Sequence, residues 1–125
     1  MHLVIIRGIP GSGKSTMAQE YVQKGYRHFE ADMFYMNDQN EYVFDPTKIK
    51  DAHAWCQEQV RQAIEVGVPV VVSNTFTQHW EYQPYVDMAS KHDYDLTILV
   101  ATGRFKNIHN VPDEVISRMV ERFQY

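Results

Sequence analysis

The sequence predicts an α/β protein, a three-layer α/β/α sandwich in which helices cover both faces of a mostly parallel sheet of about four to five strands. Short apolar runs alternate with longer stretches in which apolar residues recur every three or four positions, a pattern typical of strands connected by helices. At 125 residues the chain is long enough for one sizeable core. It contains no repeat and no linker, so we expect a single domain over residues 1–125.

The N-terminal part of the chain predicts a strand, a helix and a second strand. The run Leu3–Ile6 is apolar and largely β-branched, as in a strand that is buried on both faces of a parallel sheet. A helix is expected over Lys14–Lys24, with Gly25 placed to end it. A short strand is expected near Arg27–Glu30.

A long helix is predicted after a polar loop. The stretch "NDQNEYVFDP" is rich in turn-forming residues. Asp45 is suited to cap the helix that follows, and Pro46 to its first position, where the missing N–H costs nothing. Gly67 is placed to end this helix. Its apolar stripe comprises Ile49, Ala52, Cys56, Val60, Ala63 and Ile64.

The C-terminal half predicts a strand at Val68–Val72, a helix at about His79–Lys91 and a strand at Leu96–Val100. Pro84 is compatible with the helix only if it lies in the first turn, where N–H groups are unbonded. A last helix is expected to open at Pro112. We expect its core face to comprise Val115, Ile116, Met119, Val120 and Phe123.

Composition indicates a globular protein of the cytoplasm. The formal net charge is −4, so a nucleic acid would have to bind at a local basic patch. No apolar run approaches the roughly 20 residues that span a bilayer, and the apolar residues before Arg7 are too few for a signal peptide. We therefore expect no contact with a membrane. The single cysteine, Cys56, predicts no internal disulfide, no disulfide-linked partner and a reducing compartment.

The segment "RGIPGSGKST" predicts a phosphate-binding loop. Gly8 to Ser15 matches the pattern G-x-x-x-x-G-K-[ST], with the required strand before it and helix after it. Glycines allow successive N–H groups to turn inward around an anion, and the helix N-terminus adds its own unpaired N–H groups. We therefore expect a P-loop NTPase fold that binds ATP and Mg²⁺. The predicted contacts are Gly8, Pro10, Gly11, Ser12, Gly13, Lys14, Ser15 and Thr16.

Four side chains have distinct expected roles. Lys14 would bring its charge to the outer phosphates, the Ser15 hydroxyl would ligate Mg²⁺, and Thr16 would reach the α-phosphate. Asp32 follows the second strand, so its carboxylate is expected at the carboxyl edge of the sheet, beside the phosphate loop. There it would accept the proton of an acceptor hydroxyl. The alternative role for Asp32 is that of a helix or turn cap.

Six segments of the chain resemble the P-loop kinase family of polynucleotide 5′-kinases and their relatives, an AAA-type ATP-binding domain. These segments are "GIPGSGKST", "EADMF", "YVFDPTKIKDAHAW", "VVVSNT", "HWEYQPYVDMA" and "NIHNVPDEVISRM". The resemblance covers nearly the whole chain. It implies that Lys14 and Ser15 bind ATP and Mg²⁺ and that Asp32 is the general base toward a 5′-hydroxyl. It also implies that Asn74 helps to hold the acceptor, with the capping of a loop as its alternative role.

The chain departs from this family at several positions. Met33 replaces a second acid, Tyr35 stands where an arginine contacts substrate phosphate, and Ser73 replaces an acid that organises the metal. The lid is shortened to "TGRFKNIHNVP". Arg104 is the candidate in this segment to neutralise charge on the transferring phosphate, and a solvated loop charge is the equal alternative. A short lid excludes water less well, which predicts slow turnover or wasteful hydrolysis of ATP.

The sequence thus predicts an ATP- and Mg²⁺-dependent phosphotransferase. The leading acceptor is the 5′-hydroxyl of a nucleic acid or nucleotide. A small-metabolite kinase is the close alternative, and an ATP-binding module with weakened catalysis is the rival from another class. For four aromatic residues the sequence leaves two alternative roles open, which are stacking on a nucleobase and packing in the core. They are Trp55, Trp80, Tyr82 and Tyr85.

Overall fold

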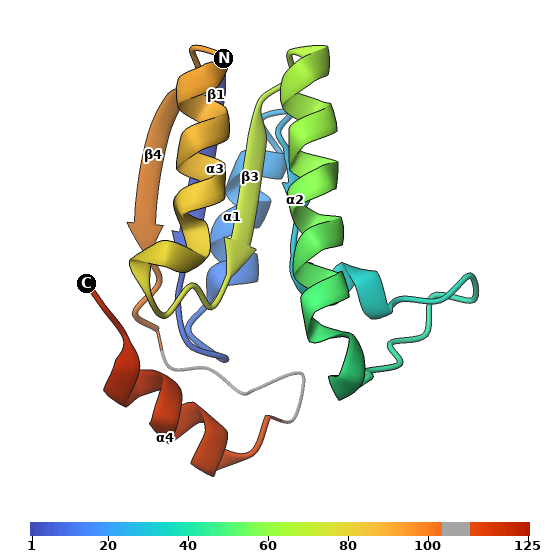
Figure 1. Ribbon diagram of the computed structural model, residues 1–125, viewed down its shortest axis with the longest axis vertical. Coiled ribbons are helices and arrows are strands. Elements are labelled where there is room, and N and C mark those ends of the chain that lie inside the picture. The colour runs from blue at the N-terminus through green and yellow to red at the C-terminus, as the bar shows by residue number, and fades with distance from the viewer. Residues whose placement is uncertain (104–110) are drawn as a thin grey trace.

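A computed structural model describes residues 1–103 and 111–125. Within these described residues, four strands form one parallel sheet in the order β2-β3-β1-β4 (Figure 1). The strands are β1 (His2–Arg7), β2 (Arg27–Phe29), β3 (Val70–Asn74) and β4 (Asp95–Val100). The helices are α1 (Lys14–Val22), α2 (Ile49–Val66), α3 (His79–Lys91) and α4 (Asp113–Arg122), with short 3-10 helices η1 (Ala31–Tyr35) and η2 (Pro46–Lys48).

The sheet separates two hydrophobic clusters, which confirms the predicted three-layer α/β/α sandwich. Leu3 and Ile5 of β1 belong to a cluster that includes residues of η1, α2 and α3. Val4 and Ile6 point to the opposite face and pack with Ala18 of α1. Because successive side chains of a strand point to opposite faces, an uninterrupted apolar run is what a doubly covered strand requires.

The start and the end of the long helix follow the local signals closely. Asp45 accepts hydrogen bonds at Oδ1 from the N–H of Thr47 at 2.9 Å and from its hydroxyl at 2.6 Å, so it caps the chain at η2. The predicted long helix therefore begins as a 3-10 turn at Pro46 and continues as α2. It ends at Gly67, whose φ of 90° is left-handed.

The third strand starts two residues later than predicted, at Val70 instead of Val68. The N–H of Val68 bonds the carbonyl of Ala63 at 3.2 Å, so Val68 belongs to the turn that closes α2. Pairing with β1 then carries the strand on to Asn74, which lies opposite Arg7. This shift places Ser73 and Asn74 inside the buried carboxyl end of the strand.

The expectation that Pro84 lies in the first turn of its helix is wrong. The helix spans His79–Lys91, so Pro84 is in the second turn. Glu81 anchors the N-terminus of α3, where its carboxylate accepts a hydrogen bond from the Thr77 hydroxyl at 2.6 Å. Tertiary packing holds the helix despite the missing N–H, because its inner face is buried. The buried residues of α3 are Tyr82, Tyr85 and Ala89.

The expected core face of the last helix is also wrong. No residue of α4 is buried, and Val120 is 54% exposed. In Figure 1, α4 lies beyond the carboxyl ends of β3 and β4 instead of covering a face of the sheet. Ile49, expected in the core stripe of α2, is 47% exposed. The faces of the sheet are already covered by α1, α2 and α3, and Ile49, Val115 and Met119 line a pocket instead.

Among the described residues, no helix has both the length and the apolarity that are needed to span a bilayer.

Candidate functional site

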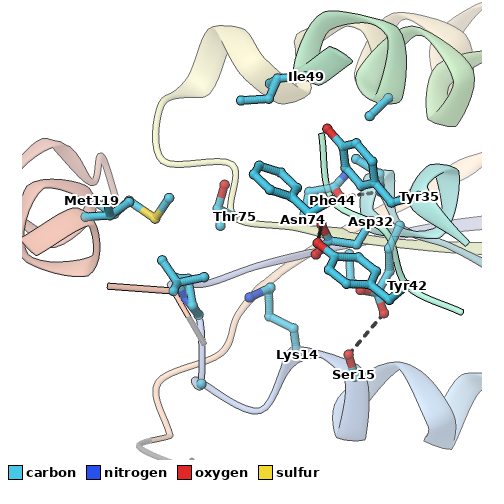
Figure 2. Close-up of a pocket in the computed structure, with 18 of the residues that line it drawn as sticks. Lys14, Ser15, Asp32, Tyr35, Tyr42, Phe44, Ile49, Asn74, Thr75 and Met119 are labelled. Atoms are coloured by element: carbon cyan, nitrogen blue, oxygen red, sulfur yellow. Dashed lines mark hydrogen bonds between the residues drawn. The ribbon is translucent and has the colours of Figure 1, made fainter. Parts of the chain in front are cut away.

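A pocket of about 560 Å³ lies beyond the carboxyl ends of the strands, the edge at which open α/β sheets bind ligands. Figure 2 shows Lys14 and Ser15 on one side of it, Met119 on another, and aromatic side chains from the segment after β2 facing them. The phosphate loop contributes Pro10, Gly11, Gly13, Lys14, Ser15 and Thr16 to its lining. Asp32, Tyr35 and Asn74 also line it, so the structure brings most of the predicted site residues together.

The phosphate loop has the backbone that an anion cradle needs. Gly11 and Gly13 have φ values of 81° and 95°, a left-handed conformation that other L-residues adopt only with strain. No side chain caps the N-terminus of α1, whose N-cap residue is Gly13. The first N–H groups of α1 therefore remain available to an anion, together with the positive end of the helix dipole.

Gly8 and Ser12 lie at the base of the loop and are not among the residues that line the pocket. Ser12 Oγ is buried and has no hydrogen-bond partner in residues 1–103 and 111–125. A Cβ atom on Gly8 would lie 2.3 Å from this oxygen. Both residues thus pack the loop against the sheet, and their predicted contact with nucleotide stays a prediction.

Lys14 carries its charge into the pocket. Its Nζ donates to the carbonyl of Ile9 at 3.0 Å, so the side chain curls back over the loop. Burial lowers the pKa of Lys14, and the carboxylates of Glu30 and Asp32 oppose that effect. The two carboxylates favour the charged form of Lys14, and its position in the phosphate loop places that charge on the lining of the pocket.

Glu30 is a site residue that the motif analysis missed. The Ser15 hydroxyl donates to Glu30 Oε1 at 3.0 Å. His28 Nε2 lies 3.3 Å from the same oxygen and 2.7 Å from Ser73 Oγ. Burial lowers the pKa of His28 and favours its neutral form, against the effect of Glu30. The available signal was the position of Glu30 at the end of a strand, one residue before Ala31-Asp32.

The donor set beside the loop fits Mg²⁺. Ser15 and Glu30 offer oxygen atoms, which Mg²⁺ prefers, and the shell of this ion is usually completed by phosphates and water. Within residues 1–103 and 111–125, no three or more His, Cys, Asp or Glu side chains gather into a cluster that could enclose a metal by itself. Ser73 stands where the resemblance implies an acid that organises the metal. The carboxylate of Glu30 reaches the same region from the end of the neighbouring strand, β2.

Asp32 lies in η1, directly after the second strand. The hydroxyl of Tyr42 donates to Asp32 Oδ1 at 3.2 Å. Tyr35 is almost fully buried, and burial, aided by Asp32, raises the pKa of its phenol. Tyr35 therefore contributes a neutral aromatic surface to the pocket, which differs in kind from the arginine that the resemblance implies at this position.

Asn74 has a structural partner that sequence reasoning did not identify. Its Oδ1 accepts from the N–H of Ala31 at 2.8 Å, and its Nδ2 lies 3.8 Å from the sulfur of Cys56. Asn74 thus caps the first N–H of η1, whereas the alternative role predicted for it was to cap the loop before α3. It thereby fixes the start of the segment that carries Asp32. Its predicted contact with an acceptor stays a prediction.

The aromatic residues near the pocket are not those that the sequence suggested. Tyr82 and Tyr85 are buried beside Phe76, with ring centroids at 5.9 and 5.6 Å. The rings that line the pocket belong to Tyr35, Tyr42 and Phe44. Arg104 and the rest of segment 104–110 lie outside the described residues, so the predicted role of Arg104 stays a prediction. Among the described lining residues, Lys14 is the one lysine or arginine.

Comparison with known proteins places this geometry in a family. A family model described as an AAA domain matches residues 3–105. Human NEDD4-binding protein 2 is 38% identical over 98% of this chain, which spans only 8% of that protein. The structure of the Pnkp1/Rnl/Hen1 RNA repair complex superimposes with a TM-score of 0.74, at 20% identity, over all of this chain and 45% of the other. A gluconokinase from Sinorhizobium meliloti gives a TM-score of 0.65, at 17% identity, over 99% of this chain and 75% of the other.

The described fold agrees with that family match. A buried strand, a glycine-rich loop and a helix without a side-chain cap follow one another inside the matched residues. Likeness to the two solved structures extends over the whole sheet and its covering helices. The chain belongs to the AAA domain family and has the fold of the P-loop kinases.

Proposed function

We propose that this chain is an ATP- and Mg²⁺-dependent phosphotransferase that moves the γ-phosphate of ATP to a hydroxyl group. One observation carries the proposal. Lys14 and Ser15 of the phosphate loop and Asp32 after β2 line the same pocket. A phosphate-holding group and a proton acceptor on a single pocket are the two parts that phosphoryl transfer to a hydroxyl requires.

The phosphate loop holds the ATP phosphates in this proposal. The N–H groups of the loop and of the first turn of α1 donate to phosphate oxygens. Lys14 exchanges its hydrogen bond to the Ile9 carbonyl for contacts with the outer phosphates. Ser15 and Glu30 hold Mg²⁺, which supplies neutralising charge to the phosphates when it is bound. Positioning and charge stabilisation account for most of the rate enhancement in this chemistry.

Asp32 accepts the acceptor's proton. As the acceptor oxygen forms its bond to the γ-phosphorus, the bond from that phosphorus to the β,γ-bridging oxygen breaks and ADP leaves. The hydroxyl proton passes to the Asp32 carboxylate. Asp32 stands on η1, whose first N–H is held by Asn74, so the base rests on a fixed element at the end of the sheet.

For the acceptor we propose the 5′-hydroxyl of a nucleic acid or nucleotide. Its support is the fold likeness to the RNA repair complex and the rings of Tyr42 and Phe44 beside Asp32, since aromatic side chains stack well on bases. A small-metabolite kinase is the second candidate. The net charge of −4 favours it, as does a pocket whose described lining includes one lysine and no arginine.

The test is a transfer assay with labelled ATP and Mg²⁺. The acceptors are 5′-hydroxyl oligonucleotides, nucleosides and a panel of small alcohols. We expect label on an oligonucleotide or nucleoside. We expect Lys14→Ala to abolish this transfer and Asp32→Asn to reduce it to a slow but measurable residual rate. Label on small alcohols alone would move the assignment to a metabolite kinase. ATP binding that Lys14→Ala removes, with no transfer to any acceptor, would identify a nucleotide-binding module instead.

A further inference from the structure

The loop between η1 and η2 has a fixed conformation, although its sequence predicts only a polar loop. Met36 and Tyr42 form an antiparallel bridge. Asn37 Oδ1 accepts from the N–H groups of Gln39 and Glu41, both at 2.9 Å. Such a side chain closes a turn that backbone bonds alone would leave open. The loop therefore presents the residue after Glu41 in one place.

That residue is Tyr42, and it points at the proposed base. Its hydroxyl lies 3.2 Å from Asp32 Oδ1. Its ring packs edge-on against Tyr35, with centroids 5.9 Å apart, and the N–H of Val43 bonds the Tyr35 carbonyl at 2.9 Å. Figure 2 shows Tyr42 and Asp32 next to each other, on the side of the pocket that faces Lys14. The ring of Tyr42 and the backbone next to it are thus both held.

We propose that Tyr42 is a positioning residue for the transfer reaction, whose hydroxyl holds one oxygen of Asp32 and so turns the other toward the acceptor. This inference rests on the proposed function. The terminal torsion of an aspartate is broad, so a carboxylate held at one oxygen populates fewer orientations. Orientation of this kind matters for rate, because a misplacement of about 1 Å can cost about a hundredfold.

The phenol of Tyr42 suits this task because it stays protonated. Burial raises the pKa of Tyr42, and the charge of Asp32 and the hydrogen bond to it raise the pKa further. Tyr42 is therefore a donor at neutral pH and does not compete with Asp32 for the acceptor proton. Because the ring of Tyr42 is partly exposed, loss of its hydroxyl leaves the core intact.

The experiment compares Tyr42→Phe with Tyr94→Phe. Tyr94 is the matched control, since its hydroxyl donates to the Ile64 and Val68 carbonyls in the hydrophobic framework, and it is not among the residues that line the pocket. We expect Tyr42→Phe to lower kcat for transfer by about tenfold to a hundredfold, with KM for ATP within about twofold of wild type and an unchanged Tm. Tyr94→Phe is expected to lower Tm and leave kcat unchanged.

A double mutant separates action through Asp32 from any independent role. In an Asp32→Asn background, Tyr42→Phe should cause no further loss of kcat, because the group it positions is already gone. An equal loss in both backgrounds would overturn the inference. An unchanged kcat in Tyr42→Phe would also overturn it. An increased kcat would overturn it as well, and would mean that the phenol occupies the place of the acceptor. Wild-type protein that transfers no phosphate would refute the proposed function and this inference together, whereas normal transfer by Tyr42→Phe would refute only the inference.

Discussion

Replacing Gly8 with alanine tests whether the phosphate loop depends on close packing at its base. A Cβ atom at this position would lie 2.3 Å from Ser12 Oγ, 3.0 Å from the Ala101 carbonyl oxygen and 3.2 Å from the Ala101 Cβ. Ala101 cannot retreat easily, because its N–H bonds the Arg7 carbonyl at 2.7 Å. The added methyl group is therefore crowded from two sides.

The expected cost of Gly8→Ala is about 1–3 kcal/mol, the usual cost of overpacking a close-packed region. For a chain of this size, this corresponds to a fall in Tm of roughly 3–6 °C per kcal/mol. The loop must also shift, so we expect weaker ATP binding. Differential scanning fluorimetry with and without ATP measures both effects.

Two further variants separate crowding from other causes. Ser12→Ala removes the nearest obstacle and a buried hydroxyl that lacks a partner among the described residues, so Gly8→Ala/Ser12→Ala should regain part of the lost stability. Gly25→Ala is the control for backbone strain, since Gly25 has a φ of 95° and a Cβ added there would meet nothing within 4 Å. It should lower the free energy of unfolding by about 1 kcal/mol without altering ATP binding. Wild-type Tm and ATP affinity in Gly8→Ala would refute the packing argument.

Three other predictions follow from the structure. Glu30→Gln should weaken ATP binding about tenfold in Mg²⁺ and leave binding in EDTA unchanged, as measured by calorimetry; equal weakening in both would argue against a metal role. Arg7→Met should lower the free energy of unfolding by about 2–3 kcal/mol in urea, because it removes the hydrogen bonds that the buried guanidinium donates to the Phe76 and Gln124 carbonyls and its contacts with the rings of Tyr82 and Phe123. Cys56 should resist alkylation at neutral pH until the chain unfolds, since burial shields the thiol and raises its pKa, which lowers its thiolate fraction; fast labelling of native protein would contradict this.

Much of the fold was predictable because its signals are local. The apolar run at the first strand, the stripe of α2 and the glycine after that helix each lie within a few residues of the element they define. The phosphate loop is also a contiguous motif. The errors occurred where a distant partner decides the outcome. The start of β3 depends on the turn that closes α2 and on pairing with β1, and Pro84 is tolerated because its helix is packed against the sheet.

The acceptor side of the site was less predictable than the phosphate side. Asp32 was found because it follows a strand, but Glu30, Tyr42 and Phe44 were not. Glu30 becomes a site residue only when the end of β2 lies beside the first turn of α1, where Ser15 meets it. Tyr42 reaches Asp32 across a turn that Asn37 closes. Neither the contact of Glu30 with Ser15 nor that of Tyr42 with Asp32 leaves a periodic or contiguous pattern in the sequence.

The sequence by itself determined the order of strands and helices, the presence of the phosphate loop and the identity of its lysine and serine, because backbone preference and motif chemistry act over short stretches of chain. The tertiary structure alone decided which side chains meet at the end of the sheet. It placed the apolar face of α4 along the pocket instead of in the core. It also brought Glu30 to Ser15 of the phosphate loop and Tyr42 to the proposed base, Asp32. The physical reason is that parallel strands far apart in sequence end at one edge, so the site is assembled by packing and register.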